Sequence, residues 1–232
     1  MKPKPEYLLD LEAWPRRSTF DHFAGYAHPN FSVCTRIDVA ALKPALAKAG
    51  VGGVSLACHY VALQVANGIE NFRYRQQGSG VRVMPLLHAS TTVLRADGKG
   101  GSFGFANLHH RPDFAAFAAA GALAMAAARE GRKHAQPAVD EAAFIYCTTL
   151  PWLHFTSFTH ARNGGLEDSI PKFAFGRIEA DGDKRWMPLG VEVNHALMDG
   201  LHVGRFVQAY AAAMREPLPW ISGAPVALPE SS

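Results

Sequence analysis

The sequence lacks features that mark several common classes of protein. It contains only three cysteines, Cys34, Cys58 and Cys147, and no two of them form a CxxC pair. An odd number of cysteines at such wide spacing argues against a disulfide framework and against a zinc knuckle. We therefore expect three buried, reduced thiols.

Charge of one sign and long apolar runs are also scarce. The net charge is only +3, and the lysines and arginines are scattered, so nothing indicates a nucleic-acid-binding surface. The most apolar stretch, residues 114–128, has 15 residues, whereas a membrane-spanning helix needs about 20. The N-terminus has prolines and acidic residues where a signal peptide needs an apolar core. These observations predict a cytoplasmic protein with no membrane partner.

Common nucleotide-binding and hydrolase motifs are missing as well. The chain has no P-loop, no GxGxxG before a predicted helix and no GxSxG nucleophile elbow. It also shows no internal repeat and no linker, which predicts a single domain over residues 1–232. Within it we expect short flexible tails at residues 1–5 and from about 220 to 232.

Helical and strand patterns are intermixed along the chain. Helices are predicted from about Trp14, over 40–50 with an interruption at Pro44, and over 55–69, 112–133 and 201–216. Strands are predicted over 31–40, 81–87, 90–96, 143–150, 172–179 and 187–197, with a hairpin turn at 181–184. This order favours the α/β (α+β) class, with a mixed β-sheet covered by helices rather than a uniformly parallel one.

One motif with chemical content joins the last predicted strand to the last predicted helix. Residues 194–205 have the sequence NHALMDGLHVGR. His195 can accept a proton near neutral pH, because the pKa of an unperturbed histidine is about 6.5. Asp199 falls where the helix begins, a position that favours a carboxylate and lets it pair with an arginine. Taken alone, the motif fits a half-buried histidine beside a capping aspartate better than it fits catalysis.

A metal site is an alternative for the same motif. His195, Asp199 and His202 could supply two histidines and one carboxylate, a set that binds iron or zinc. However, His195 is predicted to lie on the strand side of the turn, which separates it from the other two. The neighbouring histidines His109 and His110 fall in a polar loop and are expected to be solvated.

Two further segments are weak signals when each is taken alone. The segment WPRRSTF places Arg16 and Arg17 on an early helix, where such a pair usually faces solvent. The segment PWLHFTSF, residues 151–158, interleaves aromatic and hydroxyl side chains after a predicted strand, as in many cores.

Together and in this order, the three segments resemble the chloramphenicol acetyltransferase family. Trp14 and Arg16 match a family pattern of tryptophan, any residue and arginine near the start. PWLHFTSF is similar to the family's strand-end motif, and NHALMDGLHVGR resembles its HHxxxDGFHxxR. The similarity extends from Trp14 to about Arg215, and it implies the coenzyme A-dependent acyltransferase fold.

The resemblance also implies an activity and an assembly. The family's members transfer an acetyl group from acetyl-CoA to a hydroxyl of chloramphenicol, an antibiotic-resistance reaction that uses no metal. They act as homotrimers with active sites at subunit interfaces. By this resemblance His195 is the general base, Thr148 replaces a serine that stabilises the oxyanion, and Asp199 pairs with Arg16 to hold the turn.

The resemblance further implies the binding residues. The expected acceptor-binding residues are aromatic: Phe23, Phe31, Phe103, Tyr146 and Phe158. The expected coenzyme contacts are Trp152 and Arg177.

The sequence departs from the family pattern at several positions. Asn194 replaces the first histidine of the family's doublet, and Ala174 stands where a threonine is common. Three polar residues, His160, Arg162 and Lys172, lie near positions where the family tends to be apolar. Two alternatives therefore stay open: an acyltransferase of the same fold with another alcohol or thiol acceptor, and a non-catalytic trimeric binding protein.

Overall fold

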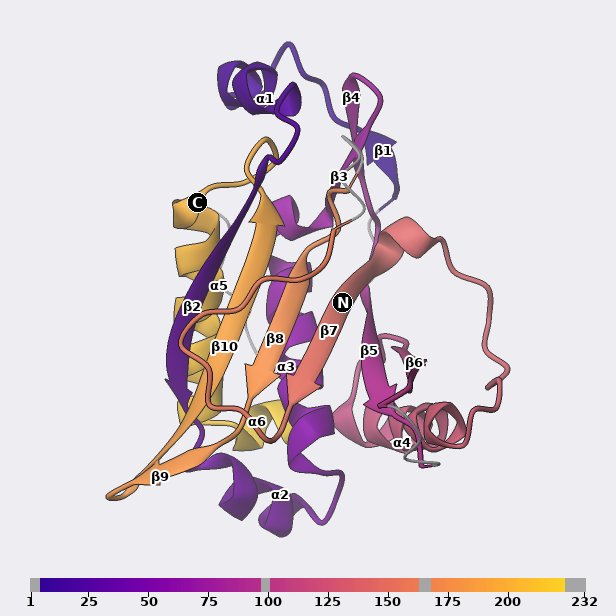
Figure 1. Ribbon diagram of the computed structural model, residues 1–232, viewed down its shortest axis with the longest axis vertical. Helices are drawn as coiled ribbons and strands as arrows, with labels where there is room; N and C mark the ends of the chain where they lie inside the picture. Colours follow the sequence, from indigo (N-terminus) through magenta and orange to yellow (C-terminus); the bar gives the residue numbers. More distant parts are fainter. Residues whose placement is uncertain (1–4, 97–100, 163–167, 224–232) are drawn as a thin grey trace.

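The computed structural model describes residues 5–96, 101–162 and 168–223, and a mixed β-sheet runs through its centre (Figure 1). The strands of this sheet follow the order β2-β10-β8-β7-β5-β6, and β9 pairs with one end of β10. The pairs β5–β7 and β7–β8 are parallel, and the others are antiparallel. The predicted mixed sheet is confirmed. Its strands are β2 (Asn30–Asp38), β5 (His88–Leu94), β6 (Phe103–Leu108), β7 (Phe144–Leu150), β8 (Lys172–Gly176), β9 (Glu179–Asp181) and β10 (Lys184–Asn194).

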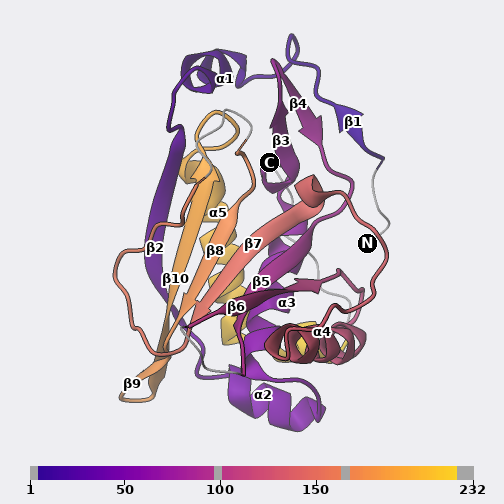
Figure 2. The same cartoon turned by 45° about the vertical axis from the view of Figure 1, so that its right-hand side comes forward.

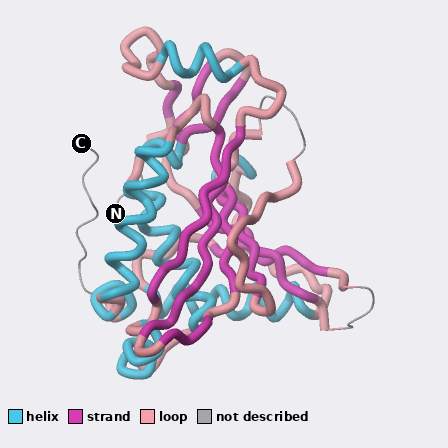
Figure 3. The backbone as a smooth tube through the Cα atoms, turned by 60° about the vertical axis from the view of Figure 1, so that its left-hand side comes forward, coloured by secondary structure: helices cyan, strands magenta, loops and turns pink. Residues whose placement is uncertain are grey.

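The long helices lie on one side of this sheet (Figure 3). α3 is buried on nearly all sides because its residues are almost all apolar or small. α4 begins at Phe114 because the Asp113 carboxylate accepts a hydrogen bond from the backbone N–H of Ala116. The helices are α2 (Leu42–Ala49), α3 (Val54–Gly68), α4 (Phe114–Arg129), α5 (Gly200–Arg215) and the short α6 (Leu218–Ile221).

A smaller sheet and the first helix lie together at one end of the molecule (Figure 2). The small sheet has the order β1-β4-β3 and encloses a second apolar cluster with Trp14 and Phe20. These elements are β1 (Tyr7–Leu8), α1 (Arg17–Ala24), β3 (Tyr74–Gln77) and β4 (Gly80–Val83), and two 3₁₀ turns cover Glu70–Arg73 and Glu141–Ala143.

The face of the main sheet opposite the long helices is partly covered by the chain that follows β7 (Figure 1). This crossing segment, residues 151–162, approaches the end of β8 closely. A Cβ atom at Gly176 would lie 2.9 Å from the carbonyl oxygen of Leu153, so only glycine allows this contact. The half of the same face formed by β5, β6 and β7 stays open.

Several sequence-based expectations need correction. The first helix begins at Arg17 rather than near Trp14. Pro44 does not interrupt α2, because it is the third residue of that helix, where a missing backbone N–H breaks no helical bond. The predicted C-terminal tail starts too early, since Ile221 of α6 is buried in the main core.

The cysteines and the neighbouring histidines also differ in part from expectation. All three thiols are free, and Cys58 and Cys147 are buried, but Cys34 is only half-buried. His109 and His110 are not simply solvated. The backbone N–H of His110 donates to Nδ1 of His88 at 2.9 Å, and the His88 and His109 rings lie 5.0 Å apart.

No single helix in the described ranges is long and apolar enough to cross a membrane. The helices α2 and α3 reach that length only together, across a bend of 100°.

Candidate active site

The turn that carries His195 directly follows the end of β10. The Oδ1 atom of Asn194 accepts a hydrogen bond of 2.9 Å from the backbone N–H of Ala196, which closes the turn. The backbone N–H of His195 donates to the carbonyl of Pro29 at 2.7 Å. Both bonds fix the backbone where the sheet ends, so the half-buried imidazole projects from a rigid strand terminus.

Two aromatic rings hold the His195 side chain. The ring of Phe23, from α1, stacks on the imidazole with centroids 4.1 Å apart and planes within 8°. The ring of Phe31, from β2, lies 4.7 Å away. Nδ1 of His195 is buried with no hydrogen-bond partner among the described residues. Phe23 and Phe31, both predicted to bind the acceptor, thus contact the predicted base.

Asp199 is the N-cap of α5 and the centre of a small polar network. Its Oδ1 accepts from the backbone N–H of Leu201 at 3.0 Å, and its Oδ2 pairs with the Arg16 guanidinium, as predicted. Arg16 also donates to the His195 carbonyl at 3.4 Å. Burial raises the pKa of Asp199, but the charges of His202 and Arg16 outweigh this and lower it below its ordinary value. The carboxylate therefore stays ionised and links α1 to the His195 turn.

His202 belongs to the helix cap. Its Nδ1 lies 2.9 Å from Oδ1 of Asp199 and 3.1 Å from the Asp199 backbone nitrogen, which makes a capping box. Among the described residues, no group of three or more histidine, cysteine or acidic side chains is placed to hold a metal ion.

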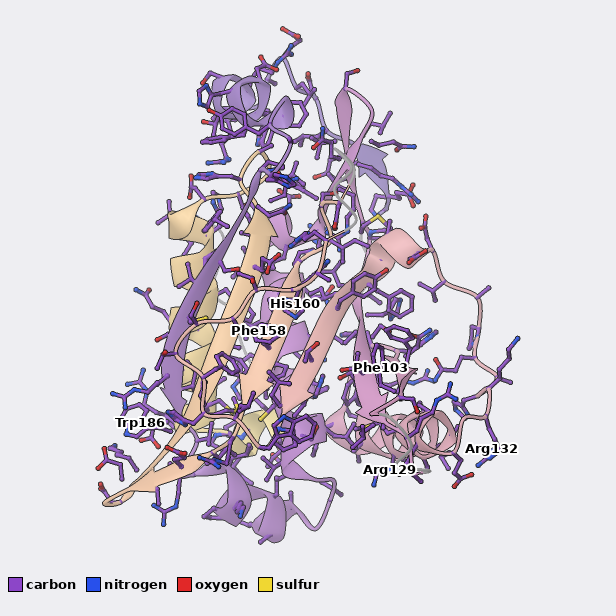
Figure 4. The ribbon with its side chains drawn as sticks, in the orientation of Figure 1. Phe103, Arg129, Arg132, Phe158, His160 and Trp186 are labelled. Carbon is purple, nitrogen blue, oxygen red and sulfur yellow. The ribbon has the colours of Figure 1, made fainter. Side chains whose placement is uncertain are left out.

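Thr148 lies elsewhere, in a cavity of about 520 Å³ on the open half of the sheet. This acceptor cavity, as we call it, is bounded by β5, β6 and β7 on one side and by the crossing segment on the other. Phe158 and His160 project from the crossing segment over the sheet, and Phe103 belongs to β6 (Figure 4). Three of the residues predicted to bind the acceptor, Phe103, Tyr146 and Phe158, line the cavity together with Thr148. Trp152, which was predicted as a coenzyme contact, lines this cavity too.

Within one copy of the chain, His195 and Thr148 are far apart. Thr148 is level with Ala174 in β8 and with Gly190 in β10, five residues before His195. Two strand spacings across the sheet and five residues along it give a separation of roughly 19 Å. The predicted base and the predicted oxyanion donor therefore cannot act on the same bond within one copy.

A second cavity, of about 350 Å³, lies between the start of α3 and the ends of β7 and β8. Thr149 lines both cavities, so the end of β7 forms the wall between them. Arg177, predicted to bind the coenzyme, lines this second cavity. Its guanidinium pairs with Glu179, and it donates to the carbonyl of Trp152 at 3.4 Å.

The sequence did not predict several residues that line the two cavities. Ser90 and Thr92 contribute hydroxyls to the acceptor cavity, and the period-two alternation of β5 was a usable signal for their shared face. Cys58 and His59 line the second cavity from α3. No pattern marked them, because α3 is apolar around its whole circumference.

Comparison with known proteins agrees with this architecture. A family model described as chloramphenicol acetyltransferase matches residues 6–211. A chloramphenicol acetyltransferase from Streptomyces acrimycini is 27% identical over 210 residues, which cover 90% of this chain and 94% of that protein.

Solved structures share the fold at lower identity. A chloramphenicol acetyltransferase superposes with a TM-score of 0.78 at 21% identity, over 90% of this chain and 99% of the other. A truncated catalytic core of the 2-oxoacid dehydrogenase multienzyme complex from Thermoplasma acidophilum gives a TM-score of 0.66 at 17% identity, over 88% and 95% of the two chains. Because the family model covers nearly the whole chain, the protein belongs to the chloramphenicol acetyltransferase family of acyltransferases.

Proposed function

We propose that the protein is an acetyl-CoA-dependent O-acetyltransferase in which His195 is the general base, with chloramphenicol as the first acceptor to test. The observation that carries the proposal is the fixed imidazole of His195. It is stacked on Phe23, and its backbone is held by Pro29 and by the Arg16–Asp199 pair. A base held in this way has little conformational freedom left to lose at the transition state.

The proposed active site is completed by a second copy of the chain. Because His195 and Thr148 are roughly 19 Å apart in one copy, the two residues must come from different copies. The open half of the sheet offers a surface for this contact. Phe103 and Trp152, which line the acceptor cavity, are 53% and 54% exposed, and Phe105 is 70% exposed. A neighbouring copy that brings its His195 to this face would cover them, and three such head-to-tail contacts close a trimer.

Acetyl-CoA would reach the reaction from the α3 side of the sheet. The second cavity lies beside the N-terminus of α3, which favours anionic groups, and Arg177, which lines this cavity, would meet a phosphate there. Its apolar lining suits the pantetheine arm. The thioester would then arrive at the end of β7, where Thr149 separates the second cavity from the acceptor cavity.

The reaction follows from these positions. His195 of one copy removes the proton from the acceptor hydroxyl as its oxygen attacks the thioester carbonyl. The Thr148 hydroxyl of the other copy donates to the oxyanion that develops, a contribution of about 3–4 kcal/mol in comparable sites. When the tetrahedral adduct breaks its C–S bond, the proton on His195 passes to the departing thiolate. The products are the acetyl ester and free coenzyme A.

The test is release of free thiol from acetyl-CoA in the presence of chloramphenicol. Drug-dependent release is expected, and His195→Ala should abolish it, whereas the exposed His134→Ala should not. A His195→Ala variant that keeps the wild-type rate would contradict the mechanism. Release with other alcohols or thiols only would favour the alternative acceptor. No release with any acceptor would favour a binding protein.

A further inference from the structure

The acceptor cavity has a charged wall that an apolar drug does not require. A row of side chains crosses the open face of the sheet through Tyr146, Lys172 and Glu192, which are neighbours on β7, β8 and β10. The next row along the same face contains Thr148 and Ala174. A cation is therefore built into the sheet one row away from the proposed oxyanion donor, roughly 8 Å from it.

Glu192 holds this wall together, because its carboxylate accepts hydrogen bonds from three other residues. Its carboxylate accepts from Nε of Arg162 at 2.5 Å, from the backbone N–H of His160 at 2.9 Å and from Oγ of Ser32 at 3.1 Å. Burial raises its pKa, but the bonds from His160 and Arg162 outweigh this and lower the pKa to about 2. The charge of Glu192 is thus used to hold the crossing segment against β10.

Arg162 is likewise occupied behind the cavity. It bonds Glu192 through Nε, and its Nη1 donates to Oδ1 of Asp168 at 2.9 Å. Neither acid lines the acceptor cavity, and neither does Arg162. These ion pairs therefore lie behind the cavity, and other side chains form its lining.

Lys172 and His160 are the titratable nitrogen-bearing side chains that line the cavity, and its described lining contains no carboxylate. The Lys172 ammonium donates to the carbonyl of Ala161 at 2.7 Å, and Oδ2 of Asp168 lies 3.7 Å away. An ammonium group has three donors, so these partners leave part of its capacity unused. The Lys172 side chain is only 9% exposed, and burial, together with the charge of Arg162, lowers its pKa.

His160 adds a second nitrogen-bearing group to the same wall. Its side chain is only 12% exposed, and its Nδ1 lies 3.5 Å from Oε2 of Glu192. Its Nε2 is buried with no hydrogen-bond partner in the parts of the chain described. The ring is held edge-on against Phe158, at 4.8 Å between centroids. A neutral aromatic drug placed here would leave the Lys172 and His160 donors unpaired, which is costly.

From this lining, and resting on the proposed function, we infer that the preferred acceptor is an alcohol that carries an anionic group, bound by Lys172 and His160. Its hydroxyl lies at Thr148 and at the His195 of the neighbouring copy, and its anionic group lies one row further along the sheet. The aromatic side chains Phe103 and Phe158 cover the carbon skeleton between them.

The test compares two alcohols that differ in one charge. 4-(Hydroxymethyl)benzoate places a carboxylate across a ring from a primary hydroxyl, a span that suits the roughly 8 Å between Thr148 and Lys172. Its methyl ester is the neutral control. With acetyl-CoA and thiol release as the assay, kcat/KM for the acid is expected to exceed that for the ester by about tenfold or more, the effect of one charge-assisted hydrogen bond. Equal values for acid and ester would overturn the inference.

Variants of Lys172 and His160 test whether these residues cause the preference for the acid. Lys172→Met should remove the preference for the acid, whereas Lys48→Met, at an exposed lysine of α2, should leave it unchanged. His160→Leu should weaken the preference and raise the turnover of chloramphenicol. If Lys172→Met destabilises the protein, binding supplies a second readout: the acid, but not the ester, should raise the melting temperature of the wild type, and less so that of His160→Leu.

The outcomes separate the two proposals. Thiol release with chloramphenicol, together with equal values for acid and ester, overturns the anionic acceptor and keeps the acetyltransferase. No thiol release with any acceptor overturns the acetyltransferase. A melting temperature that rises with the acid in the wild type but not in Lys172→Met would then still support the anion-binding wall.

Discussion

Replacement of Arg16 by alanine tests whether the ion pair with Asp199 holds the catalytic turn. The Arg16 and Asp199 side chains are only 16% and 33% exposed, so water screens the pair incompletely. Loss of one partner of a fully buried pair costs about 3–5 kcal/mol. Asp199 is partly exposed and keeps its bonds to Leu201 and its contact with His202, so we expect a loss of about 2 kcal/mol.

For a chain of this length, 2 kcal/mol lowers the melting temperature by about 4–8 °C. Thermal unfolding followed by circular dichroism at fixed protein concentration measures this shift. Arg17→Ala is the matched control, because Arg17 is the adjacent residue and its ion pairs, among the residues that the structure describes, are with the exposed Glu12 and Asp21. Its loss should cost less than about 1 kcal/mol.

Arg16→Ala should also reduce activity more than Arg17→Ala does. Because Arg16 also contacts the His195 carbonyl, Arg16→Ala should lower kcat about tenfold, while Arg17→Ala leaves it unchanged. If both variants melt at the same temperature and turn over at the same rate, the Arg16–Asp199 pair does not hold the turn.

Three further predictions concern the reaction, the packing and the pH dependence. Thr148→Val should lower kcat by about 100-fold to 1000-fold while Thr148→Ser keeps most of it; equal effects of the two would exclude a hydroxyl donor. The buried Arg75 guanidinium donates to four backbone carbonyls at 2.6–3.0 Å. Arg75→Lys keeps the charge but not the planar fork, so the free energy of unfolding in urea should fall by about 2–4 kcal/mol; an unchanged value would refute this account of the packing. Burial, as the main cause, lowers the pKa of His88 and His110 to about 4, from 6.5. Between pH 6.5 and 4 the unfolded chain binds protons that the folded protein does not. The free energy of unfolding should therefore decrease as the pH is lowered from 6.5 to 4, by on the order of 1–3 kcal/mol after allowance for partial exposure. The His88→Gln/His110→Gln double variant should flatten this profile, and the exposed His134→Gln should not.

The elements that position His195 could be predicted because their signals are local. The alternating pattern predicted a strand over 187–197, which overlaps β10 although β10 ends at Asn194. The aspartate before an apolar helical repeat predicted the start of α5. Gly50 ended α2 as expected, in the left-handed conformation that glycine permits. These boundaries depend on residues within one turn or one strand of each other.

The strands that the sequence missed depend on distant partners. β3 (Tyr74–Gln77) contains the buried and polar Arg75 and Gln76, which no strand pattern favours. Arg75 is tolerated there because carbonyls of the Phe144 region, far along the chain, accept its hydrogen bonds. Tertiary contacts thus outweigh local propensity in this strand.

The ion pairs of the charged wall could not be predicted from the sequence either. The sequence marked His160, Arg162 and Lys172 as unusual, but their partner Glu192 lies 30 residues beyond Arg162. The two meet only because the crossing segment runs over β10. The separation of His195 from Thr148 likewise follows from the strand order β10-β8-β7, which no local pattern specifies.

Mixed assemblies of two inactive variants test the shared site most directly. His195→Ala and Thr148→Val are each expected to be nearly inactive, and each keeps the residue that the other lacks. If a site takes His195 from one copy and Thr148 from the next, every mixed trimer contains one intact site. Unfolding and refolding the variants together at equal amounts should then restore about one quarter of the wild-type rate, since about three quarters of the trimers are mixed. A rate no higher than that of the separately refolded variants would contradict a site shared between copies.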